Sequence, residues 1–354
     1  MKIKYLFLLL LFILFSCKSI VFQKNSDTSF EKHIVKTDTL FTKEINIRAL
    51  LVDNDKVWFT GNNNQFGYYD LVNNKIVDKK ISKDLISSEF RSIAQTPNYI
   101  FIISIGNPAL LFKISKKDLN SSLVYEEKGE KVFYDSMQFW SETDGIAIGD
   151  PTSDCFSILI THDGGNTWNK LDCSNLPKLS EGEAAFAASN TNVLCKGSKI
   201  FVVSGGKKSR VFISDNEGVS WQVVETPIIQ GQAMTGIFSA DFYNDKLGFI
   251  VGGNYENQLD NGANKAITFD GGKSWRLVSK NTAFGYASCV QFLPDSNGEK
   301  LMSVGTSGVY YSENHGENWT KISNDSDLFT LRFQNDSTFF AAGKNKLIRV
   351  QLKK

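Results

Sequence analysis

Four copies of one eight-residue pattern constrain the fold of this chain more than any other feature of its sequence. The pattern starts with Ser or Thr, has Asp or Asn two residues later and Gly in its middle, and ends in Trp. The copies occupy residues 161–168, 214–221, 268–275 and 312–319. Their tryptophans are 53, 54 and 44 residues apart, and a repeat of this length is typical of the blades of a β-propeller.

The residue types of the pattern suit a tight turn between two strands. Asp or Asn accepts hydrogen bonds from backbone N–H groups a few residues on, and Gly adopts the positive φ that the turn needs. The Ser or Thr hydroxyl bonds back across the hairpin, while Trp begins the next strand and fills the gap between blades. We therefore expect structural roles, and neither catalysis nor metal binding, for Asp163, Trp168, Asn216, Trp221, Asp270, Trp275, Asn314 and Trp319.

Apolar segments around the turns predict four strands per blade. Two further blades without the turn pattern are expected over residues 45–82 and 90–128. The tail supplies three strands, and a strand from residues 33–41 would complete that blade, close the ring and remove its exposed edges. We thus expect an all-β, seven-bladed β-propeller, with six or eight blades as alternatives. The blades that contain the turns are predicted over residues 136–173, 184–225, 236–279 and 286–323.

The amino terminus has the pattern of an export signal. Lys2 and Lys4 precede an apolar run over residues 5–15, which is shorter than the roughly 20 residues that span a bilayer and has the size of a signal-peptide core. The run ends in Leu-Phe-Ser before Cys17, which resembles the lipobox of bacterial lipoproteins and implies lipidation of Cys17. An ordinary secretory signal or an uncleaved anchor is the alternative.

This reading divides the chain into three parts. Residues 1–16 are the signal peptide, 17–32 are the lipidated cysteine and a polar tether, and 33–354 are the propeller domain. The protein is then exported and held on a bacterial membrane, at the periplasmic side or the surface of the outer membrane. Removing the signal takes away two lysines and no acids, so the formal net charge falls from +1 to −1. Such a chain has no basic field to hold nucleic acid.

Cofactor and metal motifs are missing from the sequence. There is no strand–GxGxxG–helix unit, no paired-cysteine haem motif, and no Cys/His spacing of a zinc site. We therefore expect neither a cofactor nor a metal. Cys155 and Cys173 lie near opposite ends of one predicted pair of hairpins, and an exported protein can form disulfides. The sequence leaves open whether Cys155, Cys173, Cys195 and Cys289 are paired.

Blade topology separates the two faces of the ring. Turns between the first and second, and third and fourth, strands of a blade share one face, which we call the turn face because it carries the four turn motifs. Second-to-third turns and inter-blade links share the other, the loop face, where unlike polar side chains gather on irregular loops, as at ligand sites. Glu183 stands where an innermost strand should begin, and we expect it to face the central channel. The candidate ligand-binding residues are Asp150, Glu183, Arg210, Asn254, Tyr255 and Tyr286; the alternative is an ordinary set of solvated loops.

The turn pattern resembles the Asp-box, or BNR repeat, which sialidases also carry. Residues 145–151, 182–189 and 251–255 further resemble exported bacterial BNR-repeat propellers similar to the photosystem II stability and assembly factor family, over about residues 135–350. Members of this group are often named only "oxidoreductase". In the assembly factors basic residues of the propeller are implicated in binding partner polypeptides, but this chain has no comparable arginine cluster, so that role does not transfer.

Two functions from different classes remain. The first is a lipid-anchored binding or assembly scaffold that presents its loop face to a protein, peptide or glycan. The second is an enzyme acting on the same face, either a nominal oxidoreductase or a glycosidase that uses Asp150 and Glu183 as its two carboxyl groups. No complete catalytic motif is present in the sequence, and the arginines lack the spacing of a sialidase triad.

Overall fold

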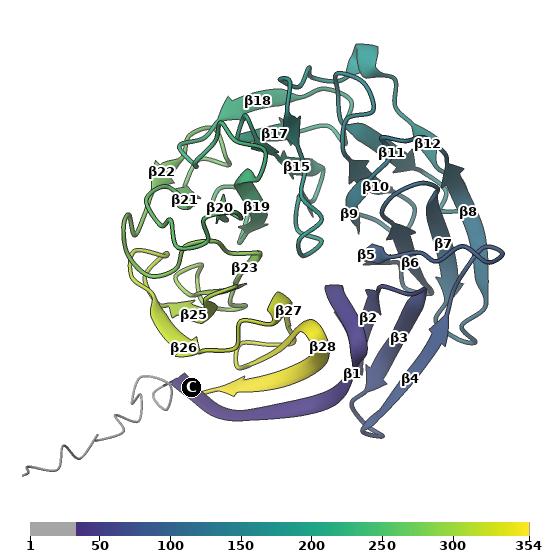
Figure 1. Ribbon diagram of the computed structural model, residues 1–354, viewed down its shortest axis with the longest axis horizontal. Coiled ribbons are helices and arrows are strands. Elements are labelled where there is room, and N and C mark those ends of the chain that lie inside the picture. Colours follow the sequence, from purple (N-terminus) through teal and green to yellow (C-terminus); the bar gives the residue numbers. More distant parts are fainter. Residues whose placement is uncertain (1–32, 354) are drawn as a thin grey trace, which may run out of the picture.

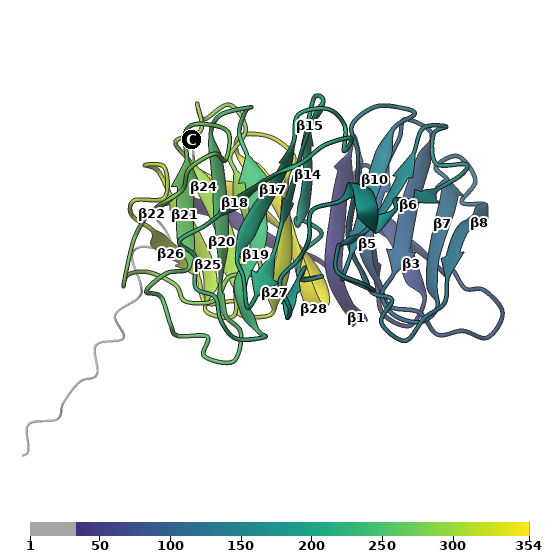
Figure 2. The same cartoon turned by 90° about the horizontal axis from the view of Figure 1, so that it is seen from above.

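The structure is a computed structural model and describes residues 33–353. Its described strands are arranged around a central axis as a β-propeller (Figure 1). Seen from the edge, the strands run between the two faces of the ring (Figure 2). The predicted signal peptide, the lipidation site at Cys17 and the tether lie outside the described residues.

The described strands form six hydrogen-bonded sheets, four of which have four strands. One consists of β5 (Phe90–Gln95), β6 (Tyr99–Ser104), β7 (Ala109–Ser115) and β8 (Ser121–Glu127). The next consists of β9 (Tyr134–Phe139), β10 (Gly145–Gly149), β11 (Ser157–Thr161) and β12 (Asn169–Lys170). A third consists of β14 (Val193–Lys196), β15 (Lys199–Val203), β17 (Arg210–Ser214) and β18 (Gln222–Glu225). A fourth consists of β23 (Cys289–Phe292), β24 (Leu301–Gly305), β25 (Gly308–Ser312) and β26 (Thr320–Ser323).

The other two sheets have six strands each. The first consists of β13 (Glu183–Ala184), β16 (Gly205–Gly206), β19 (Thr235–Phe242), β20 (Gly248–Asn254), β21 (Lys265–Thr268) and β22 (Arg276–Leu277). The second consists of β27 (Leu328–Phe333), β28 (Thr338–Leu352), β1 (Ile34–Asp53), β2 (Lys56–Gly61), β3 (Gln65–Asp70) and β4 (Lys75–Lys80). A single short 3-10 helix is described, at Cys173–Asn175.

The sheet that contains both ends of the ring is where the blade count differs from expectation. β1 pairs with β28 between Ile34 and Asn46, and with β2 between Ile47 and Asp53. The N-terminal strand therefore lies against the C-terminal one, which was the expected closure. Because β1 and β28 are both long, two groups of strands join in one sheet, and the six sheets do not confirm the predicted seven blades.

A second difference concerns the predicted blade over residues 184–225. Its innermost strand is β14, which starts only at Val193. Residues 185–192, which we call the crossing segment, instead run through the middle of the ring, where Figure 1 shows teal chain inside the circle of strands. The run of small and apolar residues that suggested a strand therefore has another role.

The hydrophobic core lies between neighbouring sheets. One cluster joins Phe101 of β6 and Met137 of β9 with Trp168, the last residue of the first turn motif. The Trp168 ring lies edge-on to Phe139, with 5.7 Å between centroids, and fills the gap between two sheets. Gly165 lets the turn approach this cluster, because its φ is +72° and a Cβ there would lie 2.3 Å from the Phe101 ring.

The turn motifs are tied together by their own polar side chains. Oδ1 of Asp163 accepts hydrogen bonds from the backbone N–H groups of Asn166 and Thr167 at 2.9 and 3.0 Å. The hydroxyl oxygen of Thr161 accepts one from the N–H of Gly165 at 3.0 Å. Equivalent bonds occur in the other three copies. The turn side chains are thus engaged within their own hairpins.

The cysteines divide into a pair and two thiols. Cys155 and Cys173 form a disulfide with their Cα atoms 5.6 Å apart, whereas Cys195 and Cys289 are free and buried. Burial raises the pKa of the Cys195 thiol to about 12, so it is protonated and unreactive at neutral pH.

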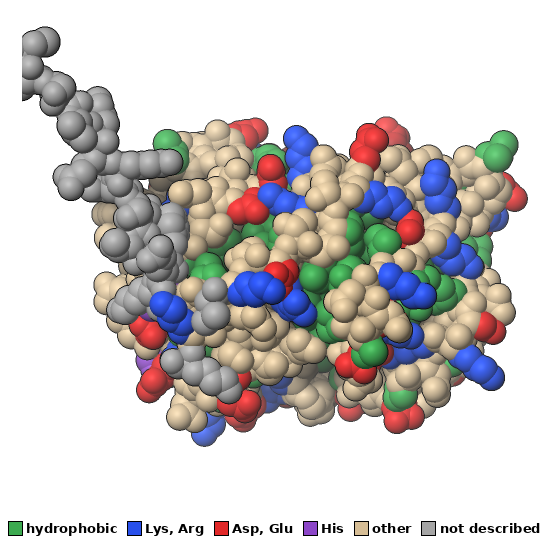
Figure 3. Space-filling model, turned by 90° about the horizontal axis from the view of Figure 1, so that it is seen from below, with side chains coloured by type: hydrophobic (Ala, Val, Ile, Leu, Met, Phe, Trp, Pro, Cys, Tyr) green, Lys and Arg blue, Asp and Glu red, His purple; other side chains and the backbone are tan. Residues whose placement is uncertain are grey.

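The surface of the described part carries no large field of one charge on the side shown in Figure 3, where Lys and Arg are interleaved with Asp and Glu. In the same part of the chain, no helix has the length and apolar character needed to cross a bilayer.

Candidate ligand-binding site on the loop face

A cavity of about 450 Å³ opens at the loop-face end of the central channel, and we call it the loop-face cavity. Two of its polar side chains lie near the first residues of innermost strands, Arg91 in β5 and Asp135 in β9, and Arg48 lies at the start of the part of β1 that pairs with β2. Asp150 and Tyr255 directly follow the second strands β10 and β20. Equivalent ends of successive blades thus converge on one space.

Aromatic rings form one wall of this cavity. Phe186 and Phe238 are stacked, with ring centroids 4.0 Å apart and planes within 6°. Tyr286 lies edge-on to Phe238 at 4.8 Å, and Tyr255 lies edge-on to Tyr286 at 5.1 Å. Tyr286 is buried, whereas Tyr255 is 40% exposed at the rim. The wall therefore offers buried aromatic faces inside the cavity and a partly exposed tyrosine at its rim.

Two arginines give the cavity positive charge. Arg48 donates to the carbonyl of Ala188 at 3.4 Å, and its guanidinium group lies 4.4 Å from the centre of the Phe329 ring. Burial lowers the pKa of Arg48, although an arginine stays charged at any physiological pH. Arg91 donates to the carboxylate of Glu89 at 2.7 Å. The Arg48 charge is thus satisfied by a carbonyl and a ring, which leaves it available to an anionic group.

A pair of carboxyl groups stands beside these arginines. Asp135 is fully buried, and neither of its carboxyl oxygens forms a hydrogen bond with a described residue. Burial and the nearby charge of Asp150 raise the pKa of Asp135 well above its ordinary value. Burial raises the pKa of Asp150 to about 6, although the N–H of Ala185 donates to it at 2.9 Å. Both carboxyl groups therefore hold a proton more readily than an ordinary aspartate does.

Three of the six candidate residues do not face this cavity. Both carboxyl oxygens of Glu183 accept hydrogen bonds from Arg210, and its side chain is completely buried. The expectation that Glu183 faces the channel is therefore wrong. Ser204 and the N–H of Ser180 also donate to Glu183, at 2.6 and 2.9 Å. Asn254 closes its own turn by accepting from the N–H groups of the two residues after Tyr255.

The structure thus brings Asp150, Tyr255 and Tyr286 together and adds residues that the sequence reasoning did not select. The additional side chains are Arg48, Arg91, Asp135, Phe186 and Phe238. A signal for the first three existed, because Arg48, Arg91 and Asp135 lie within a few residues of the starts of the blades expected from residues 45, 90 and 136, the kind of position that was used to select Glu183.

The crossing segment forms the floor of the cavity. Arg332 donates to the carbonyls of Ser189 and Asn190 at 3.0 and 3.3 Å. The Asn190 amide donates to the carbonyl of Ile93 at 2.8 Å and accepts from the N–H of Met137 at 3.0 Å. Further bonds reach Ser239 in β19, Thr330 in β27 and Ser288 just before β23. Segment 185–192 therefore divides the channel, with the loop-face cavity on one side of it.

The chemical character of the site is that of a binding pocket. Its groups can stack on flat apolar surfaces, neutralise an anion, and donate or accept hydrogen bonds. Among residues 33–353 no group of three or more His, Cys, Asp or Glu side chains is placed to hold a metal ion.

Comparisons with known proteins place the fold and leave the family open. No protein-family model and no curated protein matches the chain. Among solved structures, "YCF48 bound to D1 peptide" has a TM-score of 0.63 at 13% identity, over 90% of this chain and 95% of that chain. The RRP9 WD40 repeats have a TM-score of 0.61 at 11% identity, over 90% and 97%. YCF48 from Cyanidioschyzon merolae has 0.57 at 12%, over 89% and 98%. At these identities the likeness shows a β-propeller fold alone.

Proposed function

We propose that this protein is a binding scaffold that holds a peptide segment of a partner protein in the loop-face cavity. One observation carries the proposal: stacked aromatic rings, two arginines and two carboxyl groups line a single 450 Å³ space at the mouth of the ring. A peptide presents these complements together, since it has apolar side chains, backbone amides and charged groups. Carboxyl groups with strongly raised pKa values, such as Asp135 and Asp150, are also enriched at functional sites.

Two further points favour binding over catalysis. A structural neighbour of this chain is described as YCF48 bound to D1 peptide, so a propeller of similar shape accommodates a peptide. The glycosidase alternative needs Asp150 and Glu183 as an exposed pair. Glu183 is instead buried in its ion pair with Arg210, and its carboxyl group cannot reach a substrate in the cavity.

The same proposal includes export and a lipid anchor at Cys17. An exported protein can keep disulfides, which suits the Cys155–Cys173 bond, and acyl chains contribute about 0.8 kcal/mol per buried CH₂ to membrane binding. Radioactive palmitate should label the wild-type chain and should not label Cys17→Ala. Labelling that survives the substitution contradicts the anchor and leaves the binding proposal untouched.

We also infer that the ring counts as seven blades by position, although its sheets number six. β27, the two halves of β28 and the first half of β1 make four neighbouring strands. The second half of β1 with β2, β3 and β4 makes four more. An experimental structure that showed another number of radial groups would overturn this count.

A position-specific crosslinking experiment tests the binding face. The photoreactive residue p-benzoylphenylalanine is incorporated at position 255, at the rim of the cavity, or at position 269 in the third turn motif. Both native side chains are exposed aromatics, at 40% for Tyr255 and 55% for Phe269, and they lie on opposite faces. Irradiation of membranes should give a defined protein adduct from position 255 and none from position 269.

A charge substitution identifies the cavity as the cause. Arg91→Gln in the position-255 protein should reduce the adduct several-fold, because the charge-assisted contact that Arg91 offers a ligand is lost. Arg276→Gln is the matched control, since Arg276 pairs with Glu317 at an exposed site outside the cavity. Equal adducts from both positions, or a purified adduct that is a glycan conjugate, would contradict peptide binding at this face.

A further inference from the structure

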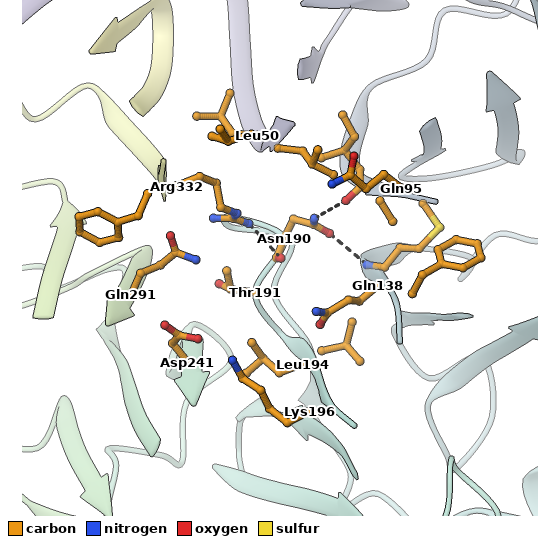
Figure 4. A pocket seen from close by; sticks show the side chains of 18 of the residues that line it. Leu50, Gln95, Gln138, Asn190, Thr191, Leu194, Lys196, Asp241, Gln291 and Arg332 are labelled. Carbon is orange, nitrogen blue, oxygen red and sulfur yellow. Dashed lines mark hydrogen bonds between the residues drawn. The ribbon is translucent and has the colours of Figure 1, made fainter. Parts of the chain in front are cut away.

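A second cavity lies at the other end of the central channel, on the turn face. Its volume is about 490 Å³, and we call it the turn-face cavity. The last residues of the innermost strands line it, including Val52, Gln95, Phe139 and Phe333. The crossing segment forms its floor through Asn190 and Thr191, so the two cavities share this segment but no side chain. Figure 4 shows polar side chains from several innermost strands around this one space, among them Gln95, Lys196, Asp241, Gln291 and Arg332.

Two cations line the turn-face cavity. Arg332 is held by the carbonyls of Leu331, Ser189 and Asn190, which are all neutral acceptors. Lys196 points into the cavity in Figure 4, and its charge acts on Asp241 across the space. Neither cation forms an ion pair of hydrogen-bonding length with a described carboxylate. The cavity therefore holds positive charge that is fixed in place.

Asp241 only partly offsets these charges. Its two carboxyl oxygens accept from the N–H groups of Phe242 and Phe292 at 2.9 and 2.8 Å. Burial raises the pKa of Asp241, and the charges of Lys196 and Arg332 oppose that rise. With Asp241 ionised, two cations face one anion. Each carboxyl oxygen also keeps a lone pair that can accept from a hydroxyl group.

Amide side chains complete the polar lining. Gln138 uses its oxygen to accept from the N–H of Cys195 at 2.8 Å, and Gln95 uses its oxygen to accept from Lys116 at 2.7 Å. Their NH₂ groups are therefore the parts left to a ligand. Gln291 forms no side-chain hydrogen bond with the described residues and points into the cavity. Donors thus outnumber acceptors around the space.

Flat apolar groups lie between the polar ones. Phe139, Phe292, Phe333 and Pro294 all line the cavity. A neighbouring hollow of about 550 Å³ shares Gln95 and Phe139 with it and opens towards the same face. The cavity is therefore reached from the turn face, and a ligand can place one apolar side against a ring.

From this lining we propose that the turn-face cavity binds a small hydroxylated organic anion of the size of a sugar acid. Lys196 and Arg332 receive the anionic group. The amides of Gln95, Gln138 and Gln291, with Asp241, bond the hydroxyl groups, and the phenylalanine rings cover the apolar side of the ligand. This site is separate from the loop-face cavity and does not depend on the peptide-binding proposal.

Titration calorimetry of the full chain tests this inference with two probes of equal size, glucuronate and glucose. Glucuronate should bind about tenfold more tightly than glucose, because only it carries the charge that Lys196 and Arg332 attract. Its affinity should fall with added salt. Lys196→Gln should weaken glucuronate binding about tenfold, and Gln291→Ala should weaken both probes.

Matched variants make each outcome decisive. Lys246→Gln removes an exposed lysine from outside the cavity and should leave binding unchanged. Arg91→Gln removes a cation from the loop-face cavity that bonds Glu89 and not the crossing segment, and it should also leave glucuronate binding unchanged. Thermal unfolding of each variant establishes that it is folded. The inference is wrong if glucuronate and glucose bind alike or not at all, if folded Lys196→Gln binds as wild type, or if Arg91→Gln alone removes binding.

Discussion

Asp135 and Asp150 are carboxyl groups of the loop-face cavity whose burial costs stability at neutral pH. Burial raises the pKa of both carboxyl groups, and the charge of Asp150 raises the pKa of Asp135 further. The folded protein therefore binds a proton that the unfolded chain would release near pH 4. Such a group lowers the free energy of unfolding at neutral pH relative to acidic pH, which is the pattern of a residue retained for its chemistry.

Asp150→Asn tests this balance. The folded pKa of about 6 exceeds the ordinary 3.8, so the contribution of Asp150 to stability is complete below about pH 4 and is lost as the pH rises through about 6. Asn keeps an oxygen for the N–H of Ala185 and cannot ionise. We expect it to raise the free energy of unfolding at pH 7.5 by about 1–3 kcal/mol and to flatten its pH dependence, as measured by urea unfolding at pH 5 and 7.5.

The control for this substitution is Asp154→Asn, four residues along the chain. Asp154 is more than half exposed, and its hydrogen bond to Lys178 lowers its pKa. Its contribution to stability is therefore present at neutral pH and is lost as the pH falls through the lowered pKa. A loss of stability in Asp150→Asn at pH 7.5 would show that the ionised carboxylate is stabilised in its site, against our expectation.

At this scale the sequence could indicate the region of the site and only part of its lining. Asp150, Tyr255 and Tyr286 follow from loop topology, because loop positions determine which face they reach. The orientation of Glu183 does not, since it depends on the position of Arg210 in another strand. A buried ion pair and an exposed catalytic pair use the same residue types.

Among the elements, the turn motifs allow a direct comparison of Asp with Asn. Oδ1 of Asp163 accepts two backbone hydrogen bonds, and Asn216 and Asn314 accept through the same oxygen in their own turns. We expect Asp163→Ala to lower the free energy of unfolding by about 1–3 kcal/mol and Asp163→Asn to change it by less than about 1 kcal/mol. Urea unfolding measures both, and equal losses would contradict a role that rests on the acceptor oxygen.

The crossing segment is the element that local sequence could not predict. Its Ala- and Phe-containing run over residues 184–188 resembles a buried strand. Its partners are instead single groups on innermost strands far along the chain, such as Ile93 and Arg332. These hydrogen bonds follow no regular spacing along the segment. Its sequence therefore contains no pattern that predicts them.

The whole molecule depends on the pairing of its two ends. Leu347, Val350 and Leu352 of β28 are buried, and this part of the strand pairs with β1. We expect deletion of residues 347–354 to abolish cooperative thermal unfolding, because it exposes strand edges on both sides of the gap. Arg349→Met is the control: it removes a partly exposed ion pair with Asp38 and should change stability by less than about 1 kcal/mol. A cooperative transition in the deletion variant would contradict this role of the closure.

At the same scale, repeat spacing was sufficient to predict an all-β propeller, four-stranded blades and the meeting of the two ends. The number of separate sheets was not predictable from spacing, because it depends on whether β1 and β28 continue unbroken from one blade position to the next.

The crossing segment is the floor of both cavities, and this couples ligand affinity at the two ends of the channel. Arg48 holds the carbonyl of Ala188 from the loop side, and Arg332 holds those of Ser189 and Asn190 from the turn side. A ligand in one cavity that displaces the crossing segment changes the shape of the other cavity. Linkage then requires reciprocity: the factor by which a loop-side ligand alters turn-side affinity equals the factor in the opposite direction. A ligand that moves the crossing segment in one cavity therefore changes ligand affinity in the other cavity.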